Sequence, residues 1–453
     1  MNKRLTLSTT HVIMLSFLGA ILFGSILLAL PISTATGEAI PYLDAFFTAT
    51  SAACVTGLVT VTTATSWSVF GQAVILFLIQ IGGLGIVTVT AGIMLALNRR
   101  MGLSDRLLIR DAFNLNTLSG ISNFLKRVII GTLIVEGSGA LLYMTVFVPE
   151  FGLRGIWFSV FNAVSAFCNA GMDIIGTDSL CGYAFDPLVM GVTSALIILG
   201  GLGFPVWWDL IRVWSLAVQK KKFRFLSHLT LHSKMALAST AALLFGGGIL
   251  IFLFEYGNPS GLEDMNLTEK MQVALFQSVT TRTAGFYTVD QQSLAPATTV
   301  LSLILMFIGG SPVGTAGGVK TVTMLILAAY AFSTIRGTQE VCLFKRRIPK
   351  DTLRKAVAVV GMSFLIAAVS TIMLCAVCPN CEPIDVLYET ISATATVGLS
   401  RNLTPVLPSA GKLIIIATMY LGRVGPISLA VAFVVKREKK NAVSHPEESV
   451  SVG

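Results

Sequence analysis

Long apolar runs recur along the chain and are separated by short polar or basic segments. A membrane-spanning helix needs about 20 mostly apolar residues. Eight runs meet this requirement, at residues 12–31, 71–97, 128–149, 187–211, 235–254, 298–335, 356–377 and 412–435. The first run is too long for the core of a typical signal peptide, so we interpret it as a retained helix. The pattern predicts an all-α polytopic membrane protein with eight transmembrane helices.

The composition supports this interpretation. Of the 453 residues, 54% are hydrophobic and 12% are charged, whereas soluble domains contain about 25% charged residues. The net charge of +9 is divided among short clusters between apolar runs, which argues against a nucleic-acid-binding protein. Seven cysteines are too few for a disulfide scaffold of this length.

The basic residues predict the orientation of the chain. Of the 32 Lys and Arg residues, 25 fall in five segments: the N-terminus, 99–127, 212–234, 336–355 and 436–440. The loops on the other side carry mainly acidic residues. Because short basic loops stay on the cytoplasmic side of a membrane, we expect a multi-pass plasma-membrane protein with both termini in the cytoplasm.

Two short motifs recur four times in the same order. The first ends in Gly57, Gly171, Gly285 and Gly398, which are separated by 114, 114 and 113 residues. The second begins 24 to 29 residues later, at Gly82, Gly200, Gly309 and Gly422. Repetition at a nearly constant period indicates an internal structural repeat. The predicted units are residues 1–110, 111–225, 226–345 and 346–436, followed by a cytoplasmic tail at 437–453.

Each predicted unit holds two spans on either side of a segment that is too short to cross the membrane. With two crossings per unit, all four units share one orientation, which makes them parallel repeats around an axis along the membrane normal. Four re-entrant pore helices then meet near this axis. Irregular backbone at membrane depth is tolerated only where it is buried or lines a water-filled path. We therefore expect a central ion pore.

The glycine that ends each re-entrant segment predicts a cation filter. Glycine adopts a positive φ without steric cost, so successive carbonyls can point the same way. A ring of carbonyl oxygens replaces the water shell of a partly dehydrated cation. Close helix contact alone would not explain the Thr, Ser and Asn neighbours of these glycines. The predicted filter residues are Val55, Thr56, Gly57, Asn169, Ala170, Gly171, Thr283, Ala284, Gly285, Thr396, Val397 and Gly398.

On these motifs, residues 10–436 closely resemble the Trk/Ktr/HKT superfamily of potassium transporters. The absence of two additional N-terminal helices makes the chain similar to the Ktr-type membrane subunits (KtrB). In this superfamily the glycine of each pore loop is the main selectivity determinant, a role that matches the four glycines above. Some Na⁺-favouring relatives carry serine at the first position, so Gly57 implies K⁺ as the transported ion, bound through filter backbone carbonyls.

The resemblance also implies partners. It implies a homodimer with one pore per protomer, and a cytoplasmic ring of nucleotide-binding, KtrA-like regulatory subunits. The sequence has no nucleotide-binding fingerprint, so we expect no nucleotide to be bound by this chain. Na⁺ is kept as a candidate activator, and we expect the lipid bilayer but no nucleic acid as a further partner. Nothing in the sequence resembles a hydrolase site, and we expect no enzymatic activity.

The second helix of the third unit is predicted to break. Five glycines and one proline lie within residues 309–318, and each glycine costs about 1 kcal/mol and the proline about 3 kcal/mol in a helix. A soluble phosphate-binding loop is disfavoured because Gly-Lys-Ser/Thr is absent. In the superfamily this stretch is the intramembrane gating loop. The predicted gate residues are Gly309, Gly310, Ser311, Pro312, Val313, Gly314, Thr315, Ala316, Gly317, Gly318, Lys320 and Arg423.

Arg423 stands where the other units have Gly83, Gly201 and Gly310. A guanidinium in mid-membrane costs at least about 2.5–3.5 kcal/mol unless it faces the interior. We expect it level with the glycine-rich loop, where it would donate to freed carbonyls and oppose the passing cation, and the resemblance assigns the matching Arg this barrier role. The alternative is a structural ion pair, with Glu136 as the candidate partner.

Weaker signals leave several alternatives open. Cys378 and Cys381 could form a disulfide on the outer side, and the role of Glu136 is not defined. Acidic residues near the outer mouth could raise the local cation concentration, or they could simply be solvated; they are Asp44, Asp173, Asp178, Asp290 and Glu389. For the function, an obligately coupled Na⁺–K⁺ or H⁺–K⁺ symporter is the second candidate. A membrane scaffold or receptor is disfavoured by the four intact glycines.

Overall fold

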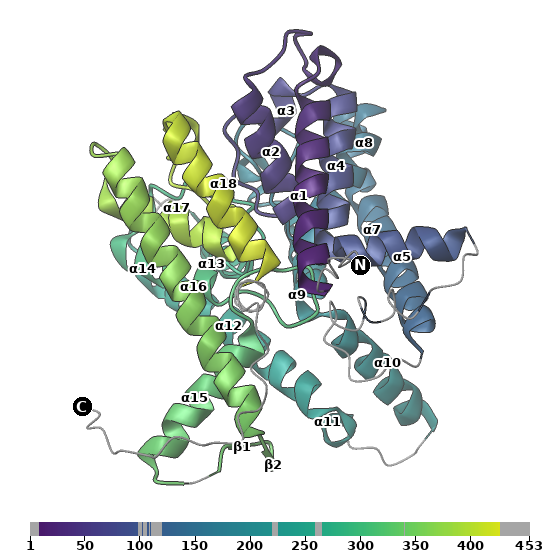
Figure 1. Ribbon diagram of the computed structural model, residues 1–453, viewed down its shortest axis with the longest axis vertical. Coiled ribbons are helices and arrows are strands. Elements are labelled where there is room, and N and C mark those ends of the chain that lie inside the picture. The colour runs from purple at the N-terminus through teal and green to yellow at the C-terminus, as the bar shows by residue number, and fades with distance from the viewer. Residues whose placement is uncertain are drawn as a thin grey trace, which may run out of the picture.

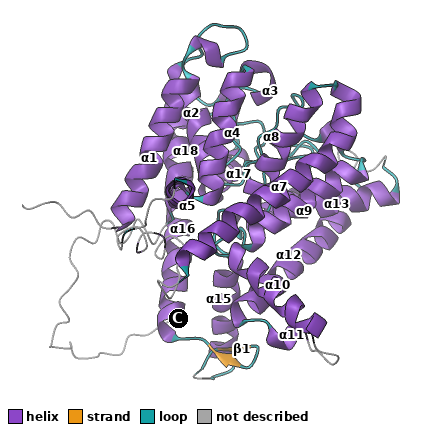
Figure 2. Ribbon diagram, turned by 90° about the vertical axis from the view of Figure 1, so that its right-hand side faces the viewer, coloured by secondary structure: helices purple, strands orange, loops and turns teal. Residues whose placement is uncertain are grey.

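The computed structural model describes residues 9–97, 102, 107, 109, 120–219, 225–258, 265–338 and 340–425, and this part of the chain is mostly helical. Its two short strands, β1 (Cys342–Leu343) and β2 (Arg346–Arg347), pair as an antiparallel hairpin. Figure 2 shows this hairpin at one end of a body made of helices. The predicted helical class therefore holds for the described residues.

The same order of elements occurs four times, namely a long helix, a short helix, a loop and a second helix (Figure 1). The first group is α1 (Thr9–Leu28), α2 (Tyr42–Cys54), α4 (Val69–Leu84) and α5 (Ile86–Ala96); the second is α7 (Ile121–Phe151), α8 (Arg154–Cys168), α9 (Pro187–Leu202) and α10 (Phe204–Gln219). The third is α12 (Leu231–Glu255), α13 (Leu267–Thr280), α14 (Pro296–Phe307) and α15 (Thr321–Ile335); the fourth is α16 (Lys350–Val377), α17 (Pro383–Ala395) and α18 (Ser409–Val424). Two further short helices are α3 (Thr63–Ser66) and α11 (Phe225–His228). The exact boundaries between the units stay a prediction, and the predicted tail at 437–453 lies outside the described residues.

Four helices are individually long and apolar enough to cross a membrane: α1, α7, α12 and α16. Each is the first helix of its unit and packs against the short helix that follows it. The pair α9 and α10 passes the same test together but is bent by 97°. The described residues therefore contain four such spans, or five if the bent pair is one span, on length and composition alone.

The second helices differ from the sequence prediction. We expected continuous helices over 71–97 and 187–211, but the structure breaks them at Gly85 and Gly203. Both glycines have left-handed φ values, 80° and 86°, with ψ of 137° and 141°. Gly425 ends α18 with almost the same angles, φ 89° and ψ 140°. Because a positive φ with extended ψ ends the helical hydrogen-bond pattern, the apolar run continues while the helix does not.

The break that we predicted in the third unit is present. Helix α14 ends at Phe307, and α15 begins at Thr321. A non-helical segment joins them and carries positive φ at Val313 and Gly318. This is the longest interruption among the four second helices in the described part of the chain.

The short helices form the most buried layer of the molecule. In the C-terminal halves of α2, α8 and α17, nearly every residue is buried. The long helices, in contrast, expose large apolar side chains. Examples are Leu133, Ile134 and Leu141 on α7, Phe245, Ile249 and Leu253 on α12, and Phe364, Leu365 and Ile372 on α16. An apolar exterior around a core that includes buried polar groups is expected of a protein surrounded by lipid.

The two ends of the molecule differ. In both views, the short helices α2, α8, α13 and α17 lie in one half, and α10, α11, α15 and the strand pair lie toward the other end (Figures 1 and 2). The described parts of the basic segments 212–234 and 336–355 belong to this second end. Proline at the first turn begins α9, α14 and α17, where its fixed φ suits a helix N-terminus.

Candidate ion pathway

The chain turns sharply after each short helix. Residues with left-handed φ follow there: Val55 at 56°, Asn169 at 60°, Thr283 at 65° and Thr396 at 51°. Two residues later come the motif glycines Gly57, Gly171, Gly285 and Gly398, also with positive φ of 96°, 64°, 84° and 98°. We expected the glycines to have this conformation. The left-handed Val and Thr residues were not expected, because β-branched residues rarely adopt it.

The four glycines form a closed ring. A Cβ on Gly57 would lie 2.5 Å from Ala170 O, one on Gly171 would lie 2.5 Å from Ala284 O, and one on Gly285 would lie 2.6 Å from Val397 O. A Cβ on Gly398 would overlap Thr56 O, which returns the ring to the first unit. Each glycine thus faces the carbonyl oxygen that precedes the next glycine. The predicted filter residues of all four units are brought together, and glycine is the residue that fits this close approach.

Hydroxyl groups of the short helices hold the turns in place. Ser51 Oγ accepts a hydrogen bond from the Gly57 N–H at 3.1 Å, and Ser392 Oγ accepts from the Gly398 N–H at 3.1 Å. Ser165 Oγ donates to Met172 O at 2.6 Å, and Thr280 Oγ1 donates to Phe286 O at 2.5 Å. Polar residues around the glycines therefore stabilise the backbone of the ring.

The second motif brings the second helices against the short helices. A Cβ on Gly82, Gly200 or Gly422 would overlap a carbonyl oxygen near the end of the short helix of the same unit, Ala53 O, Phe167 O or Thr394 O. These glycines are required by close backbone contact. The contact with the short helix of the same unit explains why these glycines follow the first motif at a similar distance in each unit.

The loop between α14 and α15 lies against the ends of α8 and α9 and against the turn after α13. The Ser311 N–H donates to Gly201 O at 2.8 Å, and Thr315 Oγ1 donates to Phe167 O at 2.9 Å. The Gly317 N–H donates to Thr283 Oγ1 at 3.2 Å. The loop is thus attached to the second and third units directly beside the glycine ring. Sequence reasoning placed the loop near the filter but did not identify these anchors.

Arg423 joins the loop to the first and fourth units. Its Nη1 donates to Thr315 O at 2.8 Å, and its Nη2 donates to Gly82 O. Lys320 Nζ donates to Ala316 O at 2.6 Å within the loop. Both cations are bound by backbone carbonyls, the groups that a broken helix leaves without partners.

Glu136 contacts residues other than Arg423. Its Oε2 accepts a hydrogen bond from Gln80 Nε2 at 3.2 Å, and Cys168 Sγ lies 3.9 Å from its Oε1. Glu136 is 5% exposed. The contacts of Arg423 agree with our expectation that it donates to loop carbonyls, and they do not agree with the alternative Glu136 ion pair.

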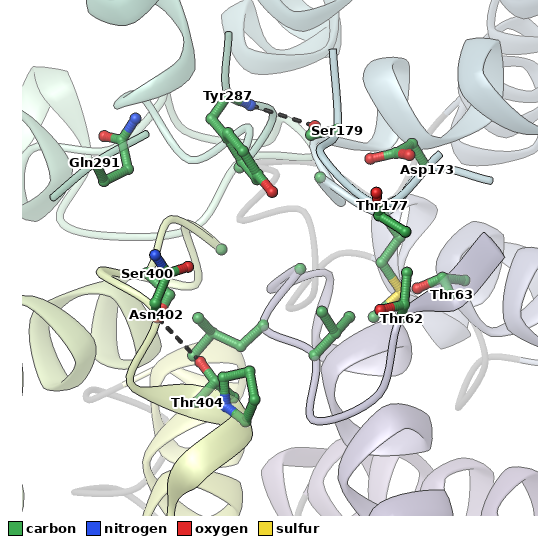
Figure 3. Close-up of a pocket in the computed structure, with 18 of the residues that line it drawn as sticks. Thr62, Thr63, Asp173, Thr177, Ser179, Tyr287, Gln291, Ser400, Asn402 and Thr404 are labelled. Carbon is green, nitrogen blue, oxygen red and sulfur yellow. Dashed lines mark hydrogen bonds between the residues drawn. The ribbon is translucent and has the colours of Figure 1, made fainter. Parts of the chain in front are cut away.

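A cavity of about 190 Å³ adjoins the glycine ring (Figure 3). All four glycines line it, together with polar residues from each unit. Asp173 and Thr177 lie on one wall, while Ser400, Asn402 and Thr404 lie across the cavity. No Lys, Arg or His is among its described lining residues.

The five acidic residues that we placed near the outer mouth have different environments. Asp44 pairs with Lys412 at 2.6 Å, and Glu389 is buried behind Ser400 and Thr404, which both donate to it. Asp178 does not line the cavity. Asp173 and Asp290 do. Of these five residues, we therefore expect only Asp173 and Asp290 to attract a cation into the cavity.

The remaining candidate is a disulfide between two cysteines. Cys378 and Cys381 are both free thiols in the structure, so the alternative of a disulfide is not realised in it. Among the described residues no group of three or more His, Cys, Asp or Glu side chains could hold a metal ion.

Comparison with known proteins identifies the family. The TrkH family model, described as a cation transport protein, matches residues 9–445. The chain therefore belongs to the TrkH family of cation transport proteins, as its motifs predicted, and this is a family of transporters rather than enzymes.

Individual relatives agree over most of their length. The chain is 39% identical to the potassium/sodium uptake protein NtpJ of Enterococcus hirae, over all of this chain and 99% of that protein. It is 37% identical to the Ktr system potassium uptake protein B of Bacillus subtilis, over 98% of this chain and 96% of that protein. The crystal structure of the potassium transporter TrkH from Vibrio parahaemolyticus shares the fold, with a TM-score of 0.73 at 16% identity over 95% of this chain and 86% of that one.

Proposed function

We propose that this chain is the ion-translocating subunit of a potassium uptake system. The observation that carries the proposal is the ring in which each motif glycine faces the carbonyl oxygen of the next unit. Four carbonyls from four units, held by hydroxyl groups behind them, can replace the water shell of a cation. The names of the relatives above support K⁺ as that cation.

In this proposal the chain crosses the membrane eight times, and its four short helices enter from the outside as pore helices. Each broken second helix counts as one crossing. K⁺ enters through the outer cavity, loses part of its water shell at the ring, and moves down its electrochemical gradient. The membrane potential supplies about 2.3 kcal/mol per charge per 100 mV.

The loop over 309–318 is the proposed gate. It lies beside the ring and is attached to the second and third units by hydrogen bonds, and Arg423 connects it to the other two. Release of this loop would remove its backbone from the path and break its hydrogen bond with Arg423. A homodimer and a cytoplasmic nucleotide-binding regulatory ring that controls the loop follow from the family resemblance, as does cytoplasmic placement of both termini.

Coupled symport of Na⁺ with K⁺ is the second candidate. The relative NtpJ is named a potassium/sodium uptake protein, and it is 39% identical to this chain. In that case Na⁺ would be a co-transported ion, whereas in our first proposal it is at most an activator.

Fluxes of radioactive Rb⁺ and Na⁺ into liposomes that carry the purified chain distinguish these functions. A selective K⁺ pathway predicts Rb⁺ uptake that follows an imposed inside-negative potential and does not need Na⁺. Obligate symport predicts no Rb⁺ uptake without external Na⁺ and a fixed ratio of the two fluxes. Absence of both fluxes, with folded protein in the membrane, would contradict both proposals.

A further inference from the structure

An apolar groove lies between the second and third units, away from the glycine ring. Its volume is about 670 Å³. Residues at the start of α9 form one wall, and residues of α12 and α13 form the other. Two of these helices also hold parts of the ion pathway: α13 leads into the turn of Gly285, and the backbone of Gly201 in α9 accepts a hydrogen bond from the loop over 309–318.

The groove has a buried floor and an exposed rim. Met190 and Phe276 on the floor are almost completely buried. On the rim, Phe245, Ile249 and Met271 are 58–63% exposed. Helix α12 is long and apolar enough to cross a membrane by itself. The rim therefore belongs to the apolar surface that meets the hydrocarbon of the bilayer, and the groove opens onto this surface.

The lining of the groove suits an apolar occupant. None of its described lining residues is charged, and the polar side chains among them are Ser194, Thr268 and Gln272. Gln272 Nε2 already donates to Ala184 O at 3.2 Å. Water needs two to four polar partners to remain in a cavity, whereas a mainly apolar pocket with a few polar groups is typical of a site for an apolar ligand.

The depth of the groove corresponds to one leaflet of the bilayer. At the end of α12, Lys270 Nζ donates to Tyr256 O at 3.1 Å and lies 4.8 Å from the centre of the Tyr256 ring. Tyrosine and lysine side chains commonly mark the level of the lipid headgroups. From Tyr256 to Phe245, at the inner end of the groove, a helix rises about 16 Å, which is close to half of the roughly 30 Å hydrocarbon thickness.

This depth favours a lipid over a second copy of the chain. An acyl chain extends from the headgroup level to the middle of the bilayer, as the groove does. A membrane-spanning helix of another protomer would cross both leaflets, whereas the lining residues of α12 stop at Phe245.

We propose that the groove is a binding site for an acyl chain of a phospholipid, in the leaflet that holds the N-terminal ends of the short helices. The chain packs between α9 and the third pore helix, α13, and fills the space between the two units. This site goes beyond the proposed function, because a lipid would bind here whichever cation the protein transports.

The test uses a phosphatidylcholine that carries a photoreactive diazirine in one acyl chain, incorporated into phosphatidylcholine vesicles that contain the full chain. Brief exchange into detergent removes loosely associated lipid before illumination, and mass spectrometry of the peptides locates the label. We expect label on the groove residues in at least about tenfold higher yield than on the exposed Phe364 of α16, a ratio that corresponds to about 1.4 kcal/mol.

Substitutions that fill the groove make the result specific. A Cβ on Gly191 would meet nothing within 4 Å, so Gly191→Phe can place its ring in the groove without displacing protein atoms. We expect this variant to lose the groove label. Gly246→Phe is the matched control, because a Cβ on Gly246 also meets nothing within 4 Å but this residue does not line the groove; the label should remain. Ser194→Leu, one turn further along α9, should act like Gly191→Phe, so the test does not depend on the folding of one variant.

Three results would contradict the lipid site. Equal label on the groove and on Phe364 after detergent exchange would mean that only bulk lipid contacts the protein. Wild-type labelling in folded Gly191→Phe and Ser194→Leu would place the lipid elsewhere. An unlabelled groove, together with disulfide-linked dimers of Ile249→Cys, would show that a second copy of the chain covers this surface.

Discussion

Substitution of Gly57 by Ser tests the ring most sharply. The new Cβ would lie 2.5 Å from Ala170 O, whereas real Cβ atoms essentially never come within 3.0 Å of such an atom. The carbonyl must therefore move by roughly half an ångström, or the first turn must shift away from the ring. A side chain at φ 96° adds backbone strain. Because Ala170 O is one of the four ring carbonyls, the perturbation acts directly on the proposed ion site.

The cost can be estimated from two contributions. A left-handed conformation costs an L-residue about 1–2 kcal/mol, and overfilling a well-packed site costs about 1–3 kcal/mol. The sum is about 2–5 kcal/mol, and it destabilises the turn that positions the carbonyls. Since about 1.4 kcal/mol corresponds to a tenfold change in an equilibrium constant, we expect discrimination of K⁺ over Na⁺ to fall at least about tenfold.

The assay is Rb⁺ uptake with Na⁺ competition in cells that lack other K⁺ uptake, with the amount of folded protein measured separately. Gly361→Ser is the matched control, because Gly361 lies in helix α16 and a Cβ there would meet nothing within 4 Å. This control should keep wild-type selectivity. Unchanged selectivity after serine substitution at each of the four ring glycines would refute the filter assignment.

Three further predictions concern the gate and the topology. Deletion of several residues within 311–317 should raise Rb⁺ flux per folded protomer and reduce its dependence on a regulatory partner; lower flux per protomer would count against a gate. Arg423→Ala should also raise flux per folded protomer, because it removes the donor to Thr315 O, whereas a purely structural role predicts less folded protein and no rise in flux per protomer. An alkaline phosphatase fusion at Ser260 should be active and one at Thr338 inactive; the reverse activities would overturn the predicted orientation.

The repeat was predictable because it rests on local chemistry. The glycines of both motifs are needed where backbones touch, at Gly57 against Ala170 O and at Gly82 against Ala53 O, and no other residue fits. The break after Phe307 was predictable for a similar reason, since five glycines and a proline cannot sustain a helix. Such positions can be recognised in a single sequence by their glycine and proline residues.

Other features depend on contacts that a single sequence does not reveal. The runs 71–97 and 187–211 stay apolar across Gly85 and Gly203, so hydropathy alone predicted continuous helices. Val55 adopts a left-handed φ against its intrinsic preference, because the surrounding ring determines its conformation. Glu136 could be recognised as a buried carboxylate, but its contact with Gln80 joins residues 56 positions apart.

Direct observation of the bound ion tests the central claim. The measurement is the anomalous scattering of crystals of the protein grown in Rb⁺, compared with crystals grown in Na⁺. Our account predicts a Rb⁺ peak inside the ring formed by the carbonyls of Thr56, Ala170, Ala284 and Val397, and loss of this peak in Gly57→Ser. A protein that transports Rb⁺ but places its Rb⁺ peak away from these carbonyls would contradict the account.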